Sequence, residues 1–374
     1  MNNKLFVENS IQELLETGRI REVKEKPWVV NPLTVSEKGD KKRLILDLSH
    51  VNFHVFKNNI KFEDWKVMLQ FLKKGDYMFK FDITQGYHHI DIFEEHQQFF
   101  GFAWNFNGKI RYFVFTVLAF GLTSGPFIFT KLMRVLIKYW RTYGIKIVCF
   151  LDDGLGGGKT SELTYNDSNF VRKSLMYAGF VINEEKSVWR PSQNITWLGV
   201  NLNSESGCFT ISKSRVDSIL QTIGQMIKDF PYTTARKIAE LCGKIVSTKF
   251  VLGNVVQLKT RRLHNIIASR QSWDGRININ EFWYEIEEIY FWKENFKRYN
   301  FRWLSSQYIP PIKAYSDASS TGIAAHFKLN GVTKIASKNL TCEDISRSST
   351  WRELFAIEHA LLSFNKFSAN KSVL

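Results

Sequence analysis

Apolar residues follow two different spacings in the first 205 residues of the chain. Where they alternate with polar residues we predict strands, and where they recur every three or four residues we predict helices. The predicted helices cover residues 8–25, 62–74, 125–143 and 160–178. The predicted strands cover residues 29–37, 42–49, 76–83, 145–155 and parts of 180–201, with a hairpin over 97–117 that turns at Asn107-Gly108. This mixture is typical of an α+β fold.

The pattern changes after residue 205. Apolar residues recur at helical spacing through residues 211–227 and 238–246, which predicts a largely helical region. A break at Ile309-Pro310-Pro311 then precedes a new strand. We therefore expect three domains, over residues 1–205, 206–308 and 309–374.

The charge of the chain indicates a polyanionic partner. Its 374 residues include 51 Lys and Arg against 36 Asp and Glu, a formal net charge of +15. Nucleic acid is the commonest partner of such a protein. An anionic membrane surface is less favoured, because the basic residues are scattered rather than massed on one amphipathic helix.

The sequence also predicts an intracellular protein, in the cytoplasm or the nucleus. The N-terminus is too polar for a signal peptide. The four cysteines lack zinc-binding spacing, so we expect reduced thiols. Residues 112–130 carry no charge, but Gly121, Gly125 and Pro126 interrupt them, which favours a buried strand and loop over a membrane span.

Two segments carry acidic residues in apolar surroundings. In FKFDITQGYHHIDI (79–92), alternation places Phe79 and Phe81 on one face of a strand and Asp82 on the other. In IKIVCFLDDGLGGG (145–158), a strongly apolar strand ends in Asp152-Asp153-Gly154. Divalent cations relieve the repulsion between neighbouring carboxylates, so the three aspartates could hold two Mg²⁺ ions. A strand-end role for Asp82 and a plain hairpin turn at Asp152-Asp153 remain open from these patterns alone.

Residues 26–205 resemble the retroelement reverse transcriptases, whose sequence blocks occur here in order. The matching blocks are Asp82 with Gly86-Tyr87, VLAFGLTSGPFIFTKLM (117–133), FLDD (150–153), GFVINEEKS (179–187) and WLGV (197–200). The FLDD form and two later strings, AYSDASSTG and WRELFAI, look most like the tyrosine-recombinase (DIRS-type) retrotransposons. The resemblance implies a right-hand polymerase fold of fingers, palm and thumb. It also implies an RNA-directed DNA polymerase that uses a template–primer, deoxynucleoside triphosphates and Mg²⁺ at Asp82, Asp152 and Asp153.

Further roles follow from the resemblance position by position. Tyr87 matches the steric gate that excludes a ribose 2′-hydroxyl, which disfavours an RNA-directed RNA polymerase. Phe120 and Gly121 match residues that face the incoming nucleotide. Arg43 matches the residue that contacts the triphosphate, and Lys186 matches the lysine proposed to protonate pyrophosphate. Without the resemblance, Arg43 and Lys186 would be interpreted as solvated surface charges.

The region 206–308 corresponds to a thumb and connection. It is basic, with 16 Lys and Arg against 9 Asp and Glu between residues 206 and 305. We expect it to bind the backbone phosphates of the duplex without reading sequence. The candidate contacts are Lys213, Arg215, Arg236, Lys237 and Lys244. For any one of them, a solvated helix face is the alternative.

The last segment resembles the start of an RNase H domain. AYSDASSTGIAAHF (314–327) predicts two strands, and a helix follows near residue 350. Asp317 and Glu353 would be two of the four carboxylates that bind two Mg²⁺ ions in that family. Thr350 and Glu353 could instead form a helix capping box. Because the sequence given ends at Leu374, before the remaining carboxylates, we expect an incomplete RNase H-like α/β domain without RNase H activity.

Two hypotheses for the whole chain follow. The first is a retrotransposon RNA-directed DNA polymerase that transfers nucleotides to a primer 3′-hydroxyl. The second is a non-catalytic, nucleic-acid-binding remnant of a retroelement. The three intact aspartates favour the first, and the missing RNase H residues favour the second.

Overall fold

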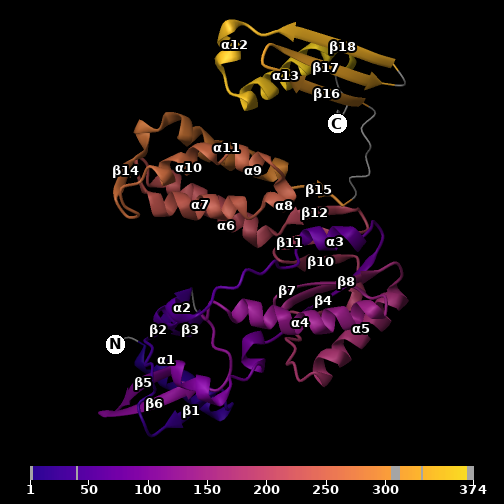
Figure 1. The fold of residues 1–374 in the computed structure, drawn as a ribbon. Coiled ribbons are helices and arrows are strands. Elements are labelled where there is room, and N and C mark those ends of the chain that lie inside the picture. Colours follow the sequence, from indigo (N-terminus) through magenta and orange to yellow (C-terminus); the bar gives the residue numbers. More distant parts are fainter. Residues whose placement is uncertain (1–2, 39–40, 305–311, 330–331, 369–374) are drawn as a thin grey trace. The chain divides into compact units, whose positions relative to one another are not determined.

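The computed structural model describes residues 3–38, 41–304, 312–329 and 332–368. The chain divides into two units, Met1–Leu304 and Ser305–Leu374. Figure 1 shows the elements of each unit. The expected α+β class is confirmed, since helices and sheets are mixed along the chain.

The N-terminal part of the first unit joins a helix to two small sheets. A three-stranded antiparallel sheet has the order β1 (Ile20–Val23), β6 (Lys109–Phe115), β5 (Gly101–Phe106). A two-stranded ribbon consists of β2 (Leu33–Lys38) and β3 (Lys41–Leu46), and α1 (Lys4–Glu16) and α2 (Ser49–His54) are the nearby helices. Val7 and Ile11 of α1 are buried in the same core as Phe102 and Phe113.

The first predicted helix was too long. We expected it to cover residues 8–25, but α1 ends at Glu16. Gly18 then adopts a φ of +69°, a left-handed conformation that reverses the chain. Ile20–Val23 pair with β6 instead, and Ile20 is buried there. The hairpin turn at Asn107-Gly108 is confirmed, with both residues at positive φ.

A four-stranded antiparallel sheet forms the centre of the first unit, in the order β7, β8, β4, β9. Its strands are β4 (Tyr77–Asp82), β7 (Lys146–Phe150), β8 (Asp153–Gly158) and β9 (Val188–Ser192). Three helices surround it: α3 (Trp65–Phe71), α4 (Gly125–Thr142) and α5 (Ser161–Tyr177). The uncharged stretch 112–130 is therefore the end of a strand, a loop and the start of α4.

The alternation expected in β4 is confirmed. Phe79 and Phe81 are buried in one core with Phe129 and Trp140 of α4, while Met78 is buried in another. Strand β8 reads Asp-Gly-Leu-Gly-Gly-Gly, and its glycines let the backbone approach these rings. A Cβ at position 154 or 156 would lie 2.2 or 2.3 Å from the rings of Phe81 and Phe79, respectively.

A second antiparallel sheet leads into the helical part of this unit. Its strands are β10 (Asn194–Trp197), β11 (Val200–Asn203), β12 (Cys208–Ile211) and β15 (Arg302–Trp303). The helical spacing was expected to start at residue 211, but Ile211 is the buried last residue of β12. The β11–β12 pair crosses the boundary expected at residue 205.

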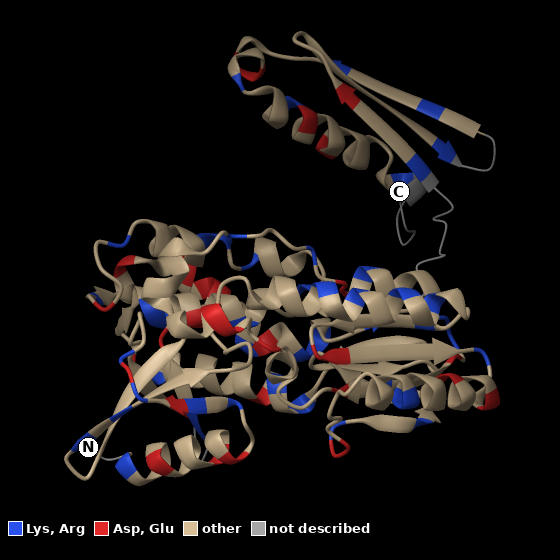
Figure 2. Cartoon of the chain, turned by 60° about the horizontal axis from the view of Figure 1, so that its bottom comes forward, with Lys and Arg blue, Asp and Glu red and all other residues tan. Residues whose placement is uncertain are grey.

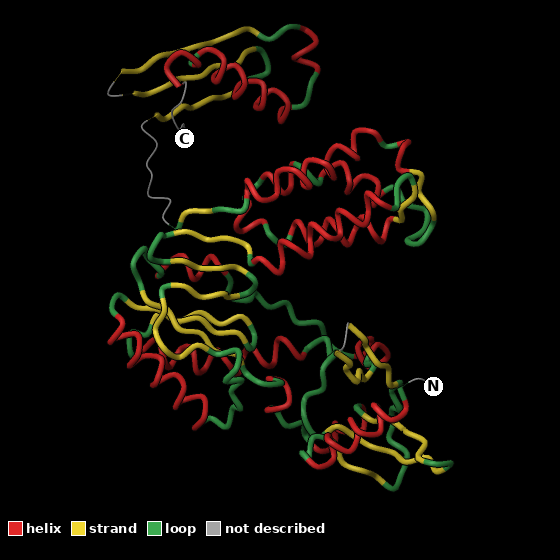
Figure 3. The backbone as a smooth tube through the Cα atoms, turned by 180° about the vertical axis from the view of Figure 1, so that it is seen from behind, coloured by secondary structure: helices red, strands yellow, loops and turns green. Residues whose placement is uncertain are grey.

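Four helices then pack side by side (Figures 1 and 3). They are α6 (Lys213–Lys228), α7 (Ala235–Val246), α10 (Arg261–Ala268) and α11 (Trp283–Tyr299). Shorter elements join them: β13 (Tyr232–Thr234), α8 (Lys249–Leu252), α9 (Val255–Leu258) and β14 (Arg276–Asn278). Ile223, Leu241, Ile289 and Trp292 are buried between them.

The second unit is a three-stranded antiparallel sheet with helices. The elements are β16 (Ile312–Ala318), β17 (Gly322–Leu329), β18 (Val332–Asn339), α12 (Cys342–Ser346), α13 (Ser349–Ser363) and α14 (Asn365–Ser368). The alternative interpretation of Thr350 and Glu353 as a capping box is wrong, because α13 begins earlier and the hydroxyl of Ser348 accepts from the Trp351 amide at 3.2 Å. None of the helices in the described ranges combines the length and apolarity needed to cross a membrane.

Candidate functional site

The ends of three neighbouring strands bring the candidate catalytic aspartates together. Asp82, the last residue of β4, lies directly opposite Asp153, the first residue of β8. The amide of Ile83 donates to the carbonyl of Asp152 at 3.1 Å, which ties β4 to the β7–β8 turn. In that turn Leu151 has a φ of +56°, a left-handed conformation that costs a non-glycine residue roughly 1 kcal/mol.

Burial and neighbouring carboxylates raise the pKa values of Asp152 and Asp153. Burial, followed by the charges of Asp152 and Asp82, raises the pKa of Asp153 from 3.8 to about 6. Burial also raises the pKa of Asp152, and the charge of Asp82 adds to the effect. A cation at Asp152 and Asp153 would favour the ionised form of both groups.

The ammonium group of Lys186 is a cation that contacts the carboxylate of Asp82. Its Nζ lies 3.3 and 3.4 Å from the two carboxylate oxygens of Asp82. The turn that carries it is bonded to β4, since the Asn183 amide donates to the Asp82 carbonyl at 2.9 Å and the Asp82 amide donates to Ser187 Oγ at 3.1 Å. Lys186 keeps 66% of its side chain exposed, so it can also reach a ligand.

Oxygen donors of this kind suit Mg²⁺, which prefers carboxylates. In the part of the chain that the structure describes, no group of three or more His, Cys, Asp and Glu side chains is arranged around a common metal position. The support for Mg²⁺ comes from the oxygen-donor chemistry of the aspartates and from the raised pKa values of Asp152 and Asp153, and the assignment remains a prediction.

Tyr87 lies in the short helix η1 (Gly86–His89) that follows Asp82. Its ring contacts those of Phe120 and Phe129, with centroid distances of 4.9 and 5.5 Å. Burial and then the charge of Asp152 raise the pKa of the Tyr87 hydroxyl, so this side chain is part of the carboxylate environment. The sequence block and the structure thus place the expected gate residue beside the aspartates.

Phe120 and Gly121 lie in the loop before α4, and Asn52 of α2 fixes this loop. The Asn52 side-chain amide donates to the carbonyl of Gly121 at 2.9 Å, and its oxygen accepts from the Thr123 amide at 2.8 Å. Gly121 has a φ of +99°, and Phe120 is 47% exposed. Sequence reasoning missed Asn52, although it stands in the same string, KRLILDLSHVN, as Arg43.

Arg43 lies on β3, where it pairs in register with Ser36. It is exposed, and it makes no ion pair with any residue in the described ranges. Its neighbour Lys42 pairs with Glu37 at 3.3 Å. Arg43 is therefore available for an anionic ligand.

Four of the five basic residues expected to bind nucleic acid have partners within the protein. Arg236 pairs with Asp274 at 2.6 Å, Lys237 with Asp229 at 2.8 Å, and Lys244 with Glu240 at 2.7 Å.

Arg215 donates to two backbone carbonyls, those of Leu198 and Ser247. Lys213, at the start of α6, is exposed and has no ion pair in the part described. Basic residues also occur on many other elements (Figure 2).

The structure separates the two carboxylates of the second unit. Asp317 pairs with Ala324 on the exposed face of the sheet, while Ile323 and Ala325 on the other face are buried in cores with α13. Glu353 lies on α13 and is exposed. Because Asp317 is on the face away from α13, the described residues do not form one site around both carboxylates.

Comparison with protein families supports the sequence blocks. Residues 36–202 match the family model for "Reverse transcriptase (RNA-dependent DNA polymerase)". The chain is 27% identical over 204 residues to the Retrovirus-related Pol polyprotein from transposon opus of Drosophila melanogaster, covering 53% of this chain and 20% of that protein. It is 24% identical over 217 residues to the Enzymatic polyprotein of Soybean chlorotic mottle virus, covering 56% of this chain and 30% of that protein.

Solved structures show the same fold. The foamy viral protease-reverse transcriptase in complex with RNA/DNA hybrid superposes with a TM-score of 0.66 at 20% identity, covering all of this chain and 48% of that one. The same protein in complex with double-stranded DNA gives a TM-score of 0.64 at 19% identity, covering 98% and 72%. The chain spans only 13–32% of the length of the curated polyproteins described by these matches.

Proposed function

We propose that the chain is an RNA-directed DNA polymerase, because residues 36–202 match the reverse transcriptase family model. It would join a deoxynucleotide to the 3′-hydroxyl of a primer paired to an RNA template. The observation that carries the proposal is the position of Asp82 opposite Asp153, with Asp152 in the adjoining turn. One of the curated relatives described above is the Pol polyprotein of a transposon, so we propose a retrotransposon origin for the chain.

Dependence on a divalent metal is general in this family. We propose that Asp82, Asp152 and Asp153 hold two Mg²⁺ ions here. When bound, the ions would favour ionisation of the primer hydroxyl and offset the charge that develops on the phosphates. The raised pKa of Asp153 supports this, because a cation would lower the free energy of the ionised form.

The protein's own side chains would orient the nucleotide. The Tyr87 ring, held against Phe120 and Phe129, would leave no room for a 2′-hydroxyl. Arg43 would contact the triphosphate, since a free guanidinium suits phosphate oxygens. Lys186, already beside Asp82, would donate a proton to the departing pyrophosphate.

The partner we propose is a template–primer duplex. The foamy viral relatives carry RNA/DNA hybrid and double-stranded DNA in their complexes, and the net charge of this chain is +15. Contacts to backbone phosphates would position the duplex and weaken with added salt. Lys213 is the proposed contact on α6 that keeps its charge free of an internal partner. Arg236, Lys237 and Lys244 would first have to leave theirs.

We propose that the second unit, as given, does not cleave RNA. It has the strand, hairpin and helix expected of an RNase H-like start, yet Asp317 lies on the sheet face away from α13 and Glu353. RNase H catalysis needs its carboxylates around shared metal ions. An RNA/DNA hybrid incubated with the chain and Mg²⁺ should therefore stay intact.

Primer extension on an RNA template tests the polymerase proposal. Wild-type protein with Mg²⁺ and deoxynucleotides should extend the primer, and Asp152→Asn should lose at least 100-fold of that activity, on the order expected for removing a metal ligand. Asp217→Asn, an exposed aspartate of α6, is the matched control and should extend normally. No extension by folded wild-type protein that still binds the duplex would refute the proposal and favour the non-catalytic remnant.

A further inference from the structure

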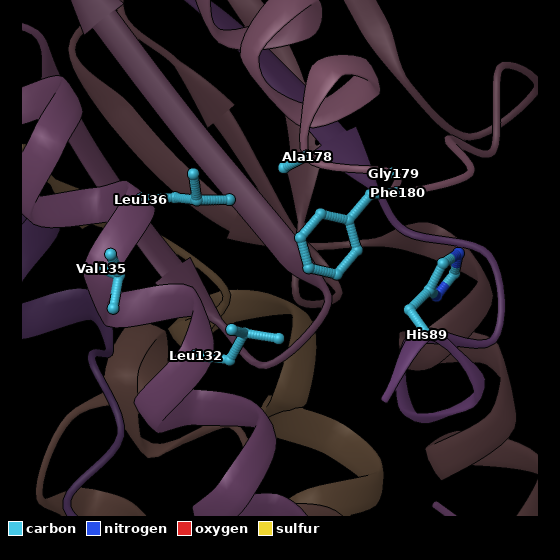
Figure 4. Close-up of a pocket in the computed structure, with 7 residues that line it drawn as sticks. All are labelled: His89, Leu132, Val135, Leu136, Ala178, Gly179 and Phe180. Carbon is cyan, nitrogen blue, oxygen red and sulfur yellow. The ribbon is translucent and has the colours of Figure 1, made fainter. Parts of the chain in front are cut away.

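The imidazole of His89 connects two catalytic segments of the domain. His89 is the last residue of η1, the helix that carries Tyr87. Its Nδ1 lies 3.2 Å from the carbonyl of Gly86, and its Nε2 lies 3.0 Å from the amide of Val181. The ring also lies 5.3 Å from that of Phe180. The two rings are tilted by 49°. Both residues line a cavity of about 300 Å³, and Figure 4 shows their side chains with the other lining residues.

These two bonds assign the tautomer of His89. A carbonyl only accepts and a backbone amide only donates, so Nδ1 carries the hydrogen and Nε2 is the acceptor. Burial lowers the pKa of His89, although the bond to Gly86 opposes this effect and the charge of Arg19 adds to it. The ring is therefore neutral at pH 7, as the bond from Val181 requires.

The bond to Val181 completes a short ladder beside the end of β4. The Thr84 amide donates to the Val181 carbonyl at 2.9 Å, and the Asn183 amide donates to the Asp82 carbonyl at 2.9 Å. Between them Ile83 and Ile182 form an antiparallel bridge. The His89 ring provides the acceptor for the amide at the start of this ladder.

Lys186 depends on the same ladder. Its amide donates to the side-chain oxygen of Asn183 at 3.2 Å, so the position of Asn183 sets the turn from which the lysine reaches Asp82. A shift of the segment that starts at Val181 would move Asn183 and then the Lys186 ammonium. The chain of bonds thus runs from the helix of Tyr87 to the proposed proton donor.

We propose that His89 is a positioning residue that holds the segment Val181–Lys186 against η1 and thereby places Lys186 at the carboxylates. The proposal rests on the polymerase function proposed above. His89 touches neither substrate nor metal ligand in it. It acts through the Val181 amide, and its absence should slow the chemical step without weakening nucleotide binding.

Two substitutions separate the hydrogen bond from the packing. His89→Leu places an apolar side chain of similar size beside the Phe180 ring but removes the acceptor. His89→Gln can present an oxygen near the position of Nε2 and should restore function. We expect His89→Leu to lower kcat about tenfold, a change of about 1.4 kcal/mol in activation free energy. The KM for deoxynucleotides should stay within about twofold. His96→Leu, at an exposed histidine of η2 (Glu94–Phe99), is the control and should leave kcat unchanged.

A double substitution tests whether the effect passes through Lys186. In a Lys186→Met background, His89→Leu should have little further effect on kcat, because the residue it positions is gone. A full tenfold loss in that background, or an unchanged kcat in the single variant, would overturn the proposal.

Hydrogen exchange at the Val181 amide provides a readout that is independent of catalysis. The exchange rate should rise roughly tenfold in His89→Leu and stay near the wild-type rate in His89→Gln. Equal rates in all three proteins would show that the bond does not hold this segment. Because exchange needs no turnover, failure of the polymerase proposal and failure of the His89 proposal remain distinguishable.

Discussion

Asp82 and Asp153 lie opposite each other in the β4–β8 ladder, so two carboxylates occupy adjacent strand ends with Asp152 one residue away. Side chains directly opposite in an antiparallel pair are close neighbours, and like charges there destabilise the pair. The β8 backbone packs closely against the buried rings of Phe79 and Phe81, so the two strand ends cannot easily move apart. The aspartates therefore reduce stability in the metal-free protein while they provide its proposed metal ligands.

The first prediction concerns the stability of Asp153→Asn. The pKa of Asp153 in the folded protein, about 6, exceeds its ordinary value of 3.8. Between these values the folded state binds more protons than the unfolded state, so this residue destabilises the fold increasingly as pH rises through 6. Without metal, Asp153→Asn should be more stable than wild type by about 1–2 kcal/mol at pH 8. The advantage should vanish below about pH 4.

Urea denaturation at pH 4, 6 and 8 with a chelator measures this difference. Asp217→Asn, which removes an exposed carboxylate on α6, should show no comparable change with pH. If Asp153→Asn and the wild type had the same free energy of unfolding at pH 8, the argument from repulsion between Asp82 and Asp153 would be contradicted.

The second prediction concerns metal removal. If the aspartates bind Mg²⁺ only in the folded state, saturating Mg²⁺ at pH 8 should raise the Tm of the wild type by roughly 3–6 °C, and a chelator should reverse the shift. Asp82→Asn and Asp152→Asn should lose most of this shift, as measured by calorimetry. An undiminished shift in both variants would place the bound metal elsewhere.

The third prediction concerns Tyr87. Its ring is confined by Phe120 and Phe129, and an ideal Cβ at Gly125 would lie 3.6 Å from it, so truncation would open space next to the nucleotide. Tyr87→Ala should improve use of ribonucleotides relative to deoxynucleotides by roughly 10- to 100-fold. Tyr87→Phe keeps the ring and should discriminate like the wild type. Ratios of kcat/KM for the two sugars measure this, and unchanged ratios in Tyr87→Ala would remove the gate assignment.

The sequence predicted the local parts of this site well. Alternation in β4 identified which side of the strand Phe79 and Phe81 face, and the glycine and asparagine of the 107–108 turn identified the hairpin. Five ordered blocks then predicted the reverse transcriptase domain, which the family comparison confirmed. Each of these signals is carried by residues close together in the chain.

Relationships between distant residues could not be predicted in this way. The bonds from Asn52 to Gly121 and Thr123, and from Val181 to His89, join residues about 70 to 90 positions apart. The partner of Arg236, Asp274, lies 38 positions away and comes close only once β13 and β14 have paired. Basic composition identified a charged region but not which of its charges were already neutralised.

The last prediction uses two neighbours on α6 that differ in this respect. Lys213 is exposed, so Lys213→Gln should leave stability unchanged and reduce the slope of log binding constant against log salt by about 0.9, the effect of one phosphate contact. Arg215 instead donates to the carbonyls of Leu198 and Ser247, and burial lowers its pKa. Arg215→Met should therefore lower the free energy of unfolding by about 1–3 kcal/mol and leave the salt slope unchanged. Filter binding over 50–200 mM salt and urea denaturation measure the two effects. Reversed results would mean that Arg215, rather than Lys213, contacts the duplex.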